Sequence, residues 1–208
     1  MPVTPRFLVF LSAALILAIT PGPGIFYVLA RSLRGGRKEG ALSAGGTFLG
    51  GLVHVGAAAL GLSAILAASA IAFEAVRYAG AAYLIYLGCR MIWSRNVEVG
   101  DKDLEAAGNT FVQGVTTEVL NPKTALFFLS FIPQFVVMHQ GHVAAQFLML
   151  GAISVTLNAC ADLAVVLFAG ALGTRMKRSA KLRRRQRAAS GAAMIGLGVY
   201  VAAARAGS

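Results

Sequence analysis

Three ionisable residues, Glu118, Lys123 and Asp162, lie in predominantly apolar stretches of the chain. A charge at the centre of a membrane helix costs roughly 2.5–3.5 kcal/mol on insertion scales. Three without partners would cost on the order of 8–10 kcal/mol, comparable with the stability of a whole domain. We therefore expect these residues to pair or to line a wet cavity. Glu118 and Lys123 would instead lie at the membrane interface if their helix began later.

Polar residues recur every four positions in two of these stretches, which places each set on one face of a helix. One set is Gln113, Thr117 and Asn121, with Glu118 alongside, and the other is Ser154, Asn158 and Asp162. Two such faces turned toward each other would form a path for a solute. Asp162 or Glu118 could carry a proton along it, and Lys123 could neutralise one of them or meet a substrate carboxylate.

His54 is a third candidate for proton transfer, because it lies in the middle of a stretch rich in glycine and alanine. A lone histidine there more often joins two helices by a hydrogen bond. The same stretch carries the pair Gly46 and Gly50, whose GxxxG spacing lets helices approach closely. We expect this stretch to pack against other helices.

Two motifs predict interruptions of helices. The first is Thr20-Pro21-Gly22-Pro23-Gly24, and the second is Asn121-Pro122-Lys123. Proline removes a backbone donor and clashes with the preceding turn. Thr20 and Asn121 are suited to cap the helix that a following proline begins. Alternatively, each proline would only kink a packed helix, which membrane helices tolerate.

Both interruptions are expected near the middle of the membrane. The distance along a helix is about 20 Å from Phe7 to Thr20 and about 16 Å from Phe111 to Asn121, against a hydrocarbon core of about 30 Å. Each interrupted helix would begin a three-helix half, so the two halves would enter from opposite sides. This arrangement is typical of inverted-repeat transporters, whose site lies where the interrupted helices meet.

The ends of interrupted helices carry opposite partial charges. The N–H groups that begin the second half-helices would attract a carboxylate, and the carbonyls that end the first would attract an ammonium group. One zone with both polarities fits a zwitterion. The predicted residues for binding or transport are Thr20, Pro21, Gly22, Pro23, Gly24, Glu118, Asn121, Pro122, Lys123, Asn158 and Asp162. We predict no catalytic residue and no cofactor.

The composition indicates a membrane protein. Of 208 residues, 57% are hydrophobic and 13% are charged, about half the charge of a soluble domain. A membrane-spanning helix needs about 20 apolar residues. The predicted spans are 7–31, 41–67, 72–93, 111–137, 144–172 and 188–204. The fold class is therefore an all-α polytopic membrane protein, with about six transmembrane helices as two inverted three-helix repeats in one domain, 1–208. Repeat one is 1–93, a cytoplasmic linker is 94–110, and repeat two is 111–208.

Basic residues predict the orientation, because cytoplasmic loops are enriched in lysine and arginine. They gather after the first, third and fifth spans, and the densest run is Arg175–Arg187. This distribution places both termini outside the cytoplasm. The run could also contact anionic lipid headgroups, although a role in topology alone would explain it. The same pattern argues against nucleic-acid binding, despite the net charge of +11.

Other functions find less support. Metal efflux would require grouped ligands, whereas Cys89, Cys160 and His54 are scattered, and we predict no metal site. A membrane enzyme would need catalytic groups clustered at one interface. A purely structural subunit would need neither interrupted helices nor buried acids. No GxxxxGK[ST] motif is present, so transport would have to use a gradient.

Several of these motifs together resemble the LysE/RhtB family of amino-acid exporters. They are the Thr20–Gly24 motif, the glycine-rich stretch with His54, the segment 78–88, Asn121-Pro122-Lys123, and Pro133-Gln134-Phe135. Their order and spacing match over nearly the whole chain. The resemblance implies a bacterial inner-membrane exporter of amino acids or close derivatives, driven by proton exchange and assembled as a homodimer. It does not identify the amino acid.

Overall fold

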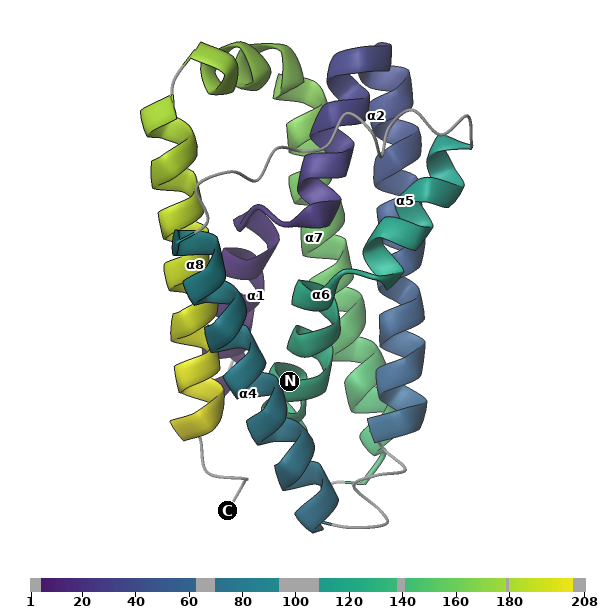
Figure 1. The fold of residues 1–208 in the computed structure, drawn as a ribbon. Coiled ribbons are helices and arrows are strands. Elements are labelled where there is room, and N and C mark those ends of the chain that lie inside the picture. The colour runs from purple at the N-terminus through teal and green to yellow at the C-terminus, as the bar shows by residue number, and fades with distance from the viewer. Residues whose placement is uncertain (1–4, 63–69, 94–108, 138–140, 179, 204–208) are drawn as a thin grey trace.

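The computed structural model describes residues 5–62, 70–93, 109–137, 141–178 and 180–203. Within these ranges the regular structure is helical throughout, and the helices run along one bundle (Figure 1). The α-helices are α1 (Pro5–Ile19), α2 (Pro23–Ala57), α4 (Ala70–Trp93), α5 (Thr110–Val119), α6 (Pro122–Leu126), α7 (Val143–Arg178) and α8 (Ala180–Ala203). A π-helical turn at Ala58–Leu62 follows α2, and Phe127–Phe131 (π) and Ile132–Phe135 (3-10) continue α6.

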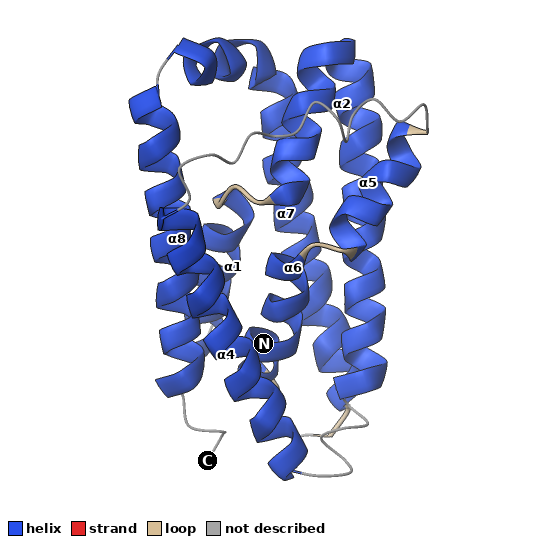
Figure 2. Ribbon diagram, in the orientation of Figure 1, coloured by secondary structure: helices blue, strands red, loops and turns tan. Residues whose placement is uncertain are grey.

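Both predicted helix interruptions are present. The structure leaves α1 at Ile19 and enters α2 at Pro23, and it leaves α5 at Val119 and enters α6 at Pro122. Figure 2 draws the two connections in tan at mid-height of the bundle. The chain rises in the view of Figure 1 through the first connection and descends through the second.

One predicted boundary is wrong. The segment between the predicted spans 7–31 and 41–67 is not a loop, because helix continues on both sides of a bend at Gly36. The backbone of Gly36 has φ 71°, a left-handed conformation that glycine adopts at little cost. The bend folds α2 back on itself, and a Cβ atom on Gly40 would lie 2.1 Å from the Ser32 hydroxyl oxygen. The basic residues here therefore extend from a helical hairpin.

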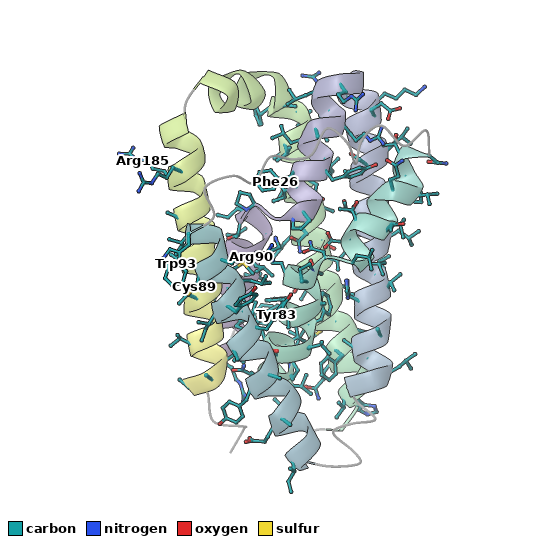
Figure 3. All side chains as sticks on the ribbon, viewed as in Figure 1. Phe26, Tyr83, Cys89, Arg90, Trp93 and Arg185 are labelled. Atoms are coloured by element: carbon teal, nitrogen blue, oxygen red, sulfur yellow. The ribbon has the colours of Figure 1, made fainter. Side chains whose placement is uncertain are left out.

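Other predicted elements are displaced or lie partly outside the described residues. The fifth and sixth predicted spans, 144–172 and 188–204, correspond to α7 and α8, which extend farther, to Arg178 and from Ala180. The basic run therefore lies largely within helix, and Figure 3 shows Arg185 projecting outward from α8. Residues 94–108 of the predicted linker and 63–67 of the second span lie outside the described residues.

Glycines allow α2 and α5 to meet backbone to backbone. A Cβ atom on Gly46 would lie 2.2 Å from the carbonyl oxygen of Phe111, and one on Gly50 would lie 2.8 Å from that of Val115. No other residue fits these positions without moving a helix. The expectation that the Gly46–Gly50 pair serves close packing is confirmed.

A similar contact joins α4 to α8. A Cβ atom on Gly88 would lie 2.5 Å from the carbonyl oxygen of Gly191, and a Cβ on Gly191 would lie 2.5 Å from that of Gly88. The relationship is reciprocal, so the two helices present equivalent surfaces to each other.

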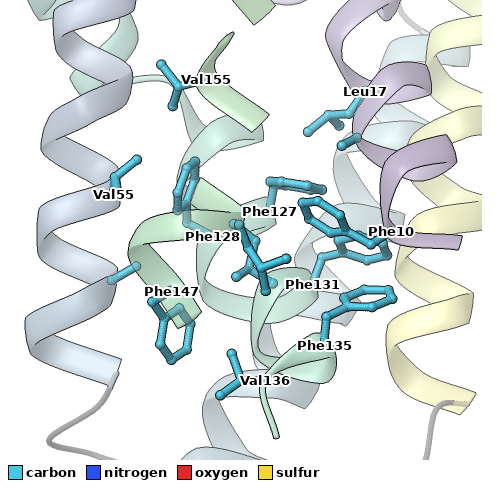
Figure 4. Close-up of a cluster of buried hydrophobic side chains, with 14 of the residues drawn as sticks. Phe10, Leu17, Val55, Phe127, Phe128, Phe131, Phe135, Val136, Phe147 and Val155 are labelled. Carbon is cyan, nitrogen blue, oxygen red and sulfur yellow. The ribbon is translucent and has the colours of Figure 1, made fainter. Parts of the chain in front are cut away.

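Aromatic side chains form the core below the interruptions. Phe127, Phe128 and Phe131 are almost fully buried, and Phe10 and Phe135 pack against them from α1 and the end of the α6 segment (Figure 4). Phe127 and Phe131 stack with ring centroids 4.9 Å apart, and Phe10 meets Phe135 edge-on at 5.4 Å. This cluster holds the α6 segment between α1 and α7 and thereby fixes the position of the second interruption.

The bundle carries apolar side chains outside and polar ones inside. Large apolar residues of α1, α2 and α7 such as Ile19, Val53 and Phe168 are exposed, whereas Glu118, Lys123 and Asp162 are each 5–7% exposed. This distribution is expected of a protein surrounded by lipid. Two helices are long and apolar enough to cross a membrane within the described residues, Pro23–Gly61 and Val143–Ala171. Arg6–Ile19 and Gly191–Ala203 are shorter apolar helices.

Candidate substrate site between the interrupted helices

The first interruption leaves an uncapped helix start. The Thr20 hydroxyl donates back to Ile16 O at 2.6 Å, so Thr20 closes α1 instead of capping α2, as its type had suggested. The N-cap of α2 is Gly22, which has no side chain to offer, and Pro23 occupies the first helical position. The N–H groups of Gly24 and Ile25 therefore have no capping side chain.

At the second interruption the helix start has a side-chain cap. Asn121 is the N-cap of α6, and its side-chain oxygen accepts a hydrogen bond from the backbone N–H of Lys123 at 3.1 Å. Pro122 occupies the first helical position, as predicted. The two interruptions are thus unequal, because only the second has a side-chain cap.

Lys123 joins the two interruptions. Its ammonium donates to Thr20 O at 2.9 Å and to Leu17 O at 3.1 Å at the end of α1, where Leu17 O also accepts from the backbone N–H of Thr20. Its side chain is buried and passes within 3.2 Å of where a Cβ atom on Gly22 would lie. The carbonyls expected to receive a substrate ammonium group are therefore already occupied by this lysine.

Glu118 is held by donors on both carboxylate oxygens. Asn121 Nδ2 donates to Oε2 at 2.9 Å, and the Thr124 hydroxyl donates to Oε1 at 2.6 Å. A Cβ atom on Gly24 would lie only 2.5 Å from Oε2. The carboxylate therefore lies against the backbone of α2. Glu118 is buried inside the bundle, and its depth in the membrane stays a prediction.

Asp162 faces the same zone from α7. Its Oδ2 lies 2.8 Å from the hydroxyl of Thr47 on α2, and no hydrogen bond is described for Oδ1 among the placed residues. One turn earlier, Asn158 donates through Nδ2 to Ser154 O at 3.1 Å. The side-chain oxygens of Asn158 and Asp162 share one face of α7, as their spacing predicted.

A small cavity connects these groups. Its volume is about 20 Å³, room for about one water molecule. The lining residues are Gly24, Ile25, Thr47, Phe48, Gly51, Glu118, Asn121, Lys123, Thr124, Val155, Asn158, Ala159 and Asp162. The structure thus brings Gly24, Glu118, Asn121, Lys123, Asn158 and Asp162 of the predicted site together. The other predicted residues, Thr20, Pro21, Gly22, Pro23 and Pro122, shape the interruptions beside it.

His54 is not among the residues that line the cavity. Its Nε2 donates to the carbonyl oxygen of Glu118 at 3.0 Å, and its ring stacks on Phe128 with centroids 6.0 Å apart. This is the helix–helix hydrogen bond that the sequence left as an alternative. The same hydrogen bond gives a partner to the carbonyl oxygen of Glu118, near the end of α5.

Sequence reasoning missed the two hydroxyl residues of the site, Thr47 and Thr124. Each lies in an apolar stretch, where threonine usually bonds to its own helix backbone. A signal was available for Thr124, which follows the N-cap Asn121 by three residues. None was available for Thr47, because its partner Asp162 is 115 positions away.

A second polar cluster joins α2 to the start of α5. The Tyr27 hydroxyl donates to Thr110 O at 2.8 Å, and Arg31 lies over the Tyr27 ring, 5.5 Å from its centroid. Arg31 also donates to Gln113 Oε1. Gln113 of the predicted polar face therefore belongs to this cluster and not to the cavity. Among the described residues, no three His, Cys, Asp or Glu side chains lie close enough to hold a metal ion.

Comparisons with known proteins agree on one family. The model of the family described as LysE type translocator matches residues 15–205. A leucine efflux protein from Klebsiella pneumoniae is 29% identical over 195 residues, which cover 92% of this chain and 90% of the relative. One from an Enterobacter species is 31% identical over 179 residues, covering 85% and 84%. No solved structure gives a significant match.

Proposed function

The chain belongs to the LysE type translocators, and from that premise we propose that it exports amino acids with apolar side chains in exchange for protons. Members of this family are membrane transport proteins and not enzymes. The observation that carries the proposal is the meeting of both interrupted helices at one buried cavity lined by Glu118, Lys123 and Asp162.

The carboxylate of the substrate binds at the start of α2. The N–H groups of Gly24 and Ile25 lie in the first turn, where a helix attracts anions, and Gly22 provides no competing cap. Lys123 adds a positive charge beside this helix start, because its Nζ lies 3.4 Å from where a Cβ atom on Gly22 would be. At the second interruption the N–H of Lys123 already donates to Asn121, and the contribution of Lys123 to the substrate is its side chain.

The ammonium group of the substrate binds on α7. Asp162 Oδ1 and the side-chain oxygen of Asn158 are the acceptors on the cavity wall without a described donor. The oxygens of Glu118 already accept hydrogen bonds from Asn121 and Thr124, so Glu118 acts as a fixed charge. An amino acid would then lie across the cavity between α2 and α7.

The substrate side chain points toward the apolar part of the wall. Ile25, Phe48 and Val155 supply this part, and Gly51 and Ala159 leave room between them. The leucine efflux proteins among the relatives support a branched apolar side chain. We therefore take leucine as the first substrate to test.

Charge balance supports proton exchange. With Glu118, Lys123 and Asp162 all ionised, the cavity carries a net charge of −1, which is costly in a buried site. One proton on Asp162 neutralises it. A zwitterion adds no net charge, but its ammonium group needs the ionised carboxylate, so proton and substrate compete for Asp162. One charge returning across about 100 mV supplies about 2.3 kcal/mol, which would support a gradient of about 50-fold.

Export also requires the bundle to change conformation. A cavity of about 20 Å³ is far too small for leucine, so the site must widen before an amino acid can bind. The helix starts and the space between α2 and α7 must become accessible from one side of the membrane and then from the other. The glycine contacts between α2 and α5 and between α4 and α8 are the surfaces on which such a movement would occur.

The proposed architecture has six membrane passes in one domain, as two inverted repeats. The passes are α1 with the first limb of α2, the second limb of α2, α4, α5 with α6, α7, and α8. Each pass of one half packs against its counterpart in the other: α2 against α7, α4 against α8, and the α1 end against Lys123. Repeat boundaries at 1–93 and 111–208 are consistent with these pairs.

The proposed location is the bacterial inner membrane, with both termini periplasmic. The bend of α2 and the α7–α8 connection, which carry much of the basic charge, lie at one end of the bundle, and α8 ends at the other (Figure 1). Contact of Arg175–Arg187 with anionic headgroups and assembly as a homodimer remain predictions of the sequence.

Asp162→Asn tests the proposal. Cells that express the protein are fed leucine dipeptides, and the leucine in the medium is measured against membrane abundance. We expect export by the wild type and a loss of at least about ten-fold in the variant, because it can neither bind a proton nor carry the charge that attracts the ammonium. Asp101→Asn, which removes a carboxylate in the predicted linker, is the matched control. Full export by Asp162→Asn would overturn the proposed mechanism.

A further inference from the structure

Thr47 has one hydroxyl hydrogen and two acceptors within reach. Its Oγ1 lies 2.9 Å from Ala44 O and 2.8 Å from Asp162 Oδ2. Thr47 is buried, so water does not freely replace either partner. A hydroxyl offers one donor and two acceptor lone pairs. Both contacts can be hydrogen bonds at once only when Asp162 supplies a hydrogen of its own.

We propose that Thr47 is the positioning residue that holds Asp162 in both of its charge states, a proposal that rests on the exporter function above. When Asp162 is ionised, Thr47 turns its hydrogen toward Oδ2. When Asp162 has taken a proton from water in the cavity, the new O–H on Oδ2 donates to Thr47 Oγ1, and Thr47 turns its hydrogen to Ala44 O. The proton returns to water when the carboxyl ionises again, and Thr47 breaks no covalent bond.

The geometry allows this change without movement of the backbone. Only the hydroxyl hydrogen rotates, and both oxygen–oxygen distances already fit hydrogen bonds. Oδ1 takes no part in this contact in either state and is available to the substrate ammonium group. The contact thus links α2, which carries the substrate carboxylate, to the proton-carrying residue of α7.

Thr47 is the residue described as hydrogen-bonded to the carboxyl group of Asp162. Glu118 of α5 and Lys123 of α6 are the titratable groups that share the cavity with Asp162. Glu118 bonds to Asn121 and Thr124, and Lys123 bonds to the carbonyls of α1. From α2, His54 bonds to the carbonyl of Glu118, so the contact of α2 with Asp162 is through the hydroxyl.

The test compares Thr47→Val, which keeps the shape and removes the hydroxyl, with Thr47→Ser, which keeps the hydroxyl. Thr156→Val is the matched control, because Thr156 is exposed on α7 and bonds to its own helix at Ala152 O. Each protein is reconstituted in liposomes, and export of radiolabelled leucine is measured between about pH 5 and pH 8. Thr47→Ala is a second hydroxyl-free variant in case the valine protein does not fold.

In Thr47→Val we expect the midpoint of the pH profile to move to higher pH by about one unit. The reason is that a hydrogen bond to the ionised carboxylate is about twice as strong as one to the neutral acid, so its loss penalises the ionised form more. Thr47→Ser and Thr156→Val should keep the wild-type midpoint. A profile unchanged in Thr47→Val and Thr47→Ala would overturn the role of Thr47 while leaving the exporter function intact.

A second measurement is independent of transport. The infrared band of the protonated Asp162 carboxyl group, assigned by its loss in Asp162→Asn, reports the hydrogen bond directly. In Thr47→Val the band should shift and its titration should move together with the transport midpoint. If the wild type exported no amino acid, the proposed function would fail, and this band would still decide whether Thr47 holds Asp162.

Discussion

The ammonium of Lys123, at the start of α6, lies 2.9 Å from the carbonyl oxygen of Thr20, at the end of α1. The two residues are 103 positions apart. Thr20 directly follows the end of α1, and Lys123 lies in the first turn of α6. The side chain of the second interruption thereby supplies a donor to the carbonyl that ends the first. This contact joins the two interruptions directly.

Lys123→Met should abolish export and weaken the fold. The methionine keeps most of the length but cannot donate, so Thr20 O loses its described donor and Leu17 O keeps only the backbone N–H of Thr20. An unsatisfied buried group costs about 1–3 kcal/mol, and the substrate carboxylate also loses its counter-charge. We expect a loss of export of at least about ten-fold and a lower unfolding temperature in detergent.

Lys38→Met is the control for that change, because Lys38 is exposed at the bend of α2. It should export and unfold as the wild type does. Normal export by Lys123→Met at normal abundance would show that neither the fold nor substrate binding needs this ammonium group.

Glu118→Gln should destabilise the protein through its neighbours. Both carboxylate oxygens accept hydrogen bonds, from Asn121 and Thr124, and an amide replaces one acceptor with a donor. We expect a loss of about 1–3 kcal/mol in the free energy of unfolding. Combined with Thr124→Val, the loss should be smaller than the sum by at least about 0.5 kcal/mol. Strict additivity in this cycle would mean that Glu118 and Thr124 are not coupled.

The sequence predicted the interruptions because proline acts locally. Pro23 and Pro122 each begin a helix, and Asn121 caps one, whatever the rest of the chain does. Burial of Glu118, Lys123 and Asp162 was predictable for a related reason, since a charge in an apolar stretch must turn inward. Helical spacing alone then placed Asn158 beside Asp162.

The pairings within the site were not predictable, because they depend on distances between helices far apart in sequence. Nothing in the chain near Lys123 indicates that its partners are carbonyls of α1. Thr47 was missed for the same reason. The segment around Gly36 was predicted as a loop because basic residues separate two apolar stretches there, whereas helix continues on both sides of a single bent residue.

Substitution of glycine by alanine should have opposite effects at two positions of α2. At Gly46 the new Cβ atom would lie 2.2 Å from a backbone oxygen of α5, whereas at Gly56 nothing lies within 4 Å. Gly46→Ala should destabilise by about 1–3 kcal/mol, because a helix must move. Gly56→Ala should be neutral or stabilising by up to about 1 kcal/mol, because alanine favours the helix. Thermal unfolding of the purified variants measures both, and equal unfolding temperatures would contradict the close packing of α2 and α5.

Single cysteines should label from opposite sides of the membrane. In a background with Cys89 and Cys160 replaced by serine, Arg37→Cys lies at the exposed bend of α2 and Ala144→Cys at the exposed start of α7. Six passes with periplasmic termini place position 37 in the cytoplasm and position 144 in the periplasm, since two passes separate the bend from residue 109 and a third brings the chain to α7. A membrane-impermeant maleimide added to intact cells should therefore modify Ala144→Cys and reach Arg37→Cys only after permeabilisation. Labelling of both from one side would mean that an odd number of passes is lost or gained between them. The two interrupted helices would then not enter from opposite sides of the membrane, and the proposed site depends on that arrangement.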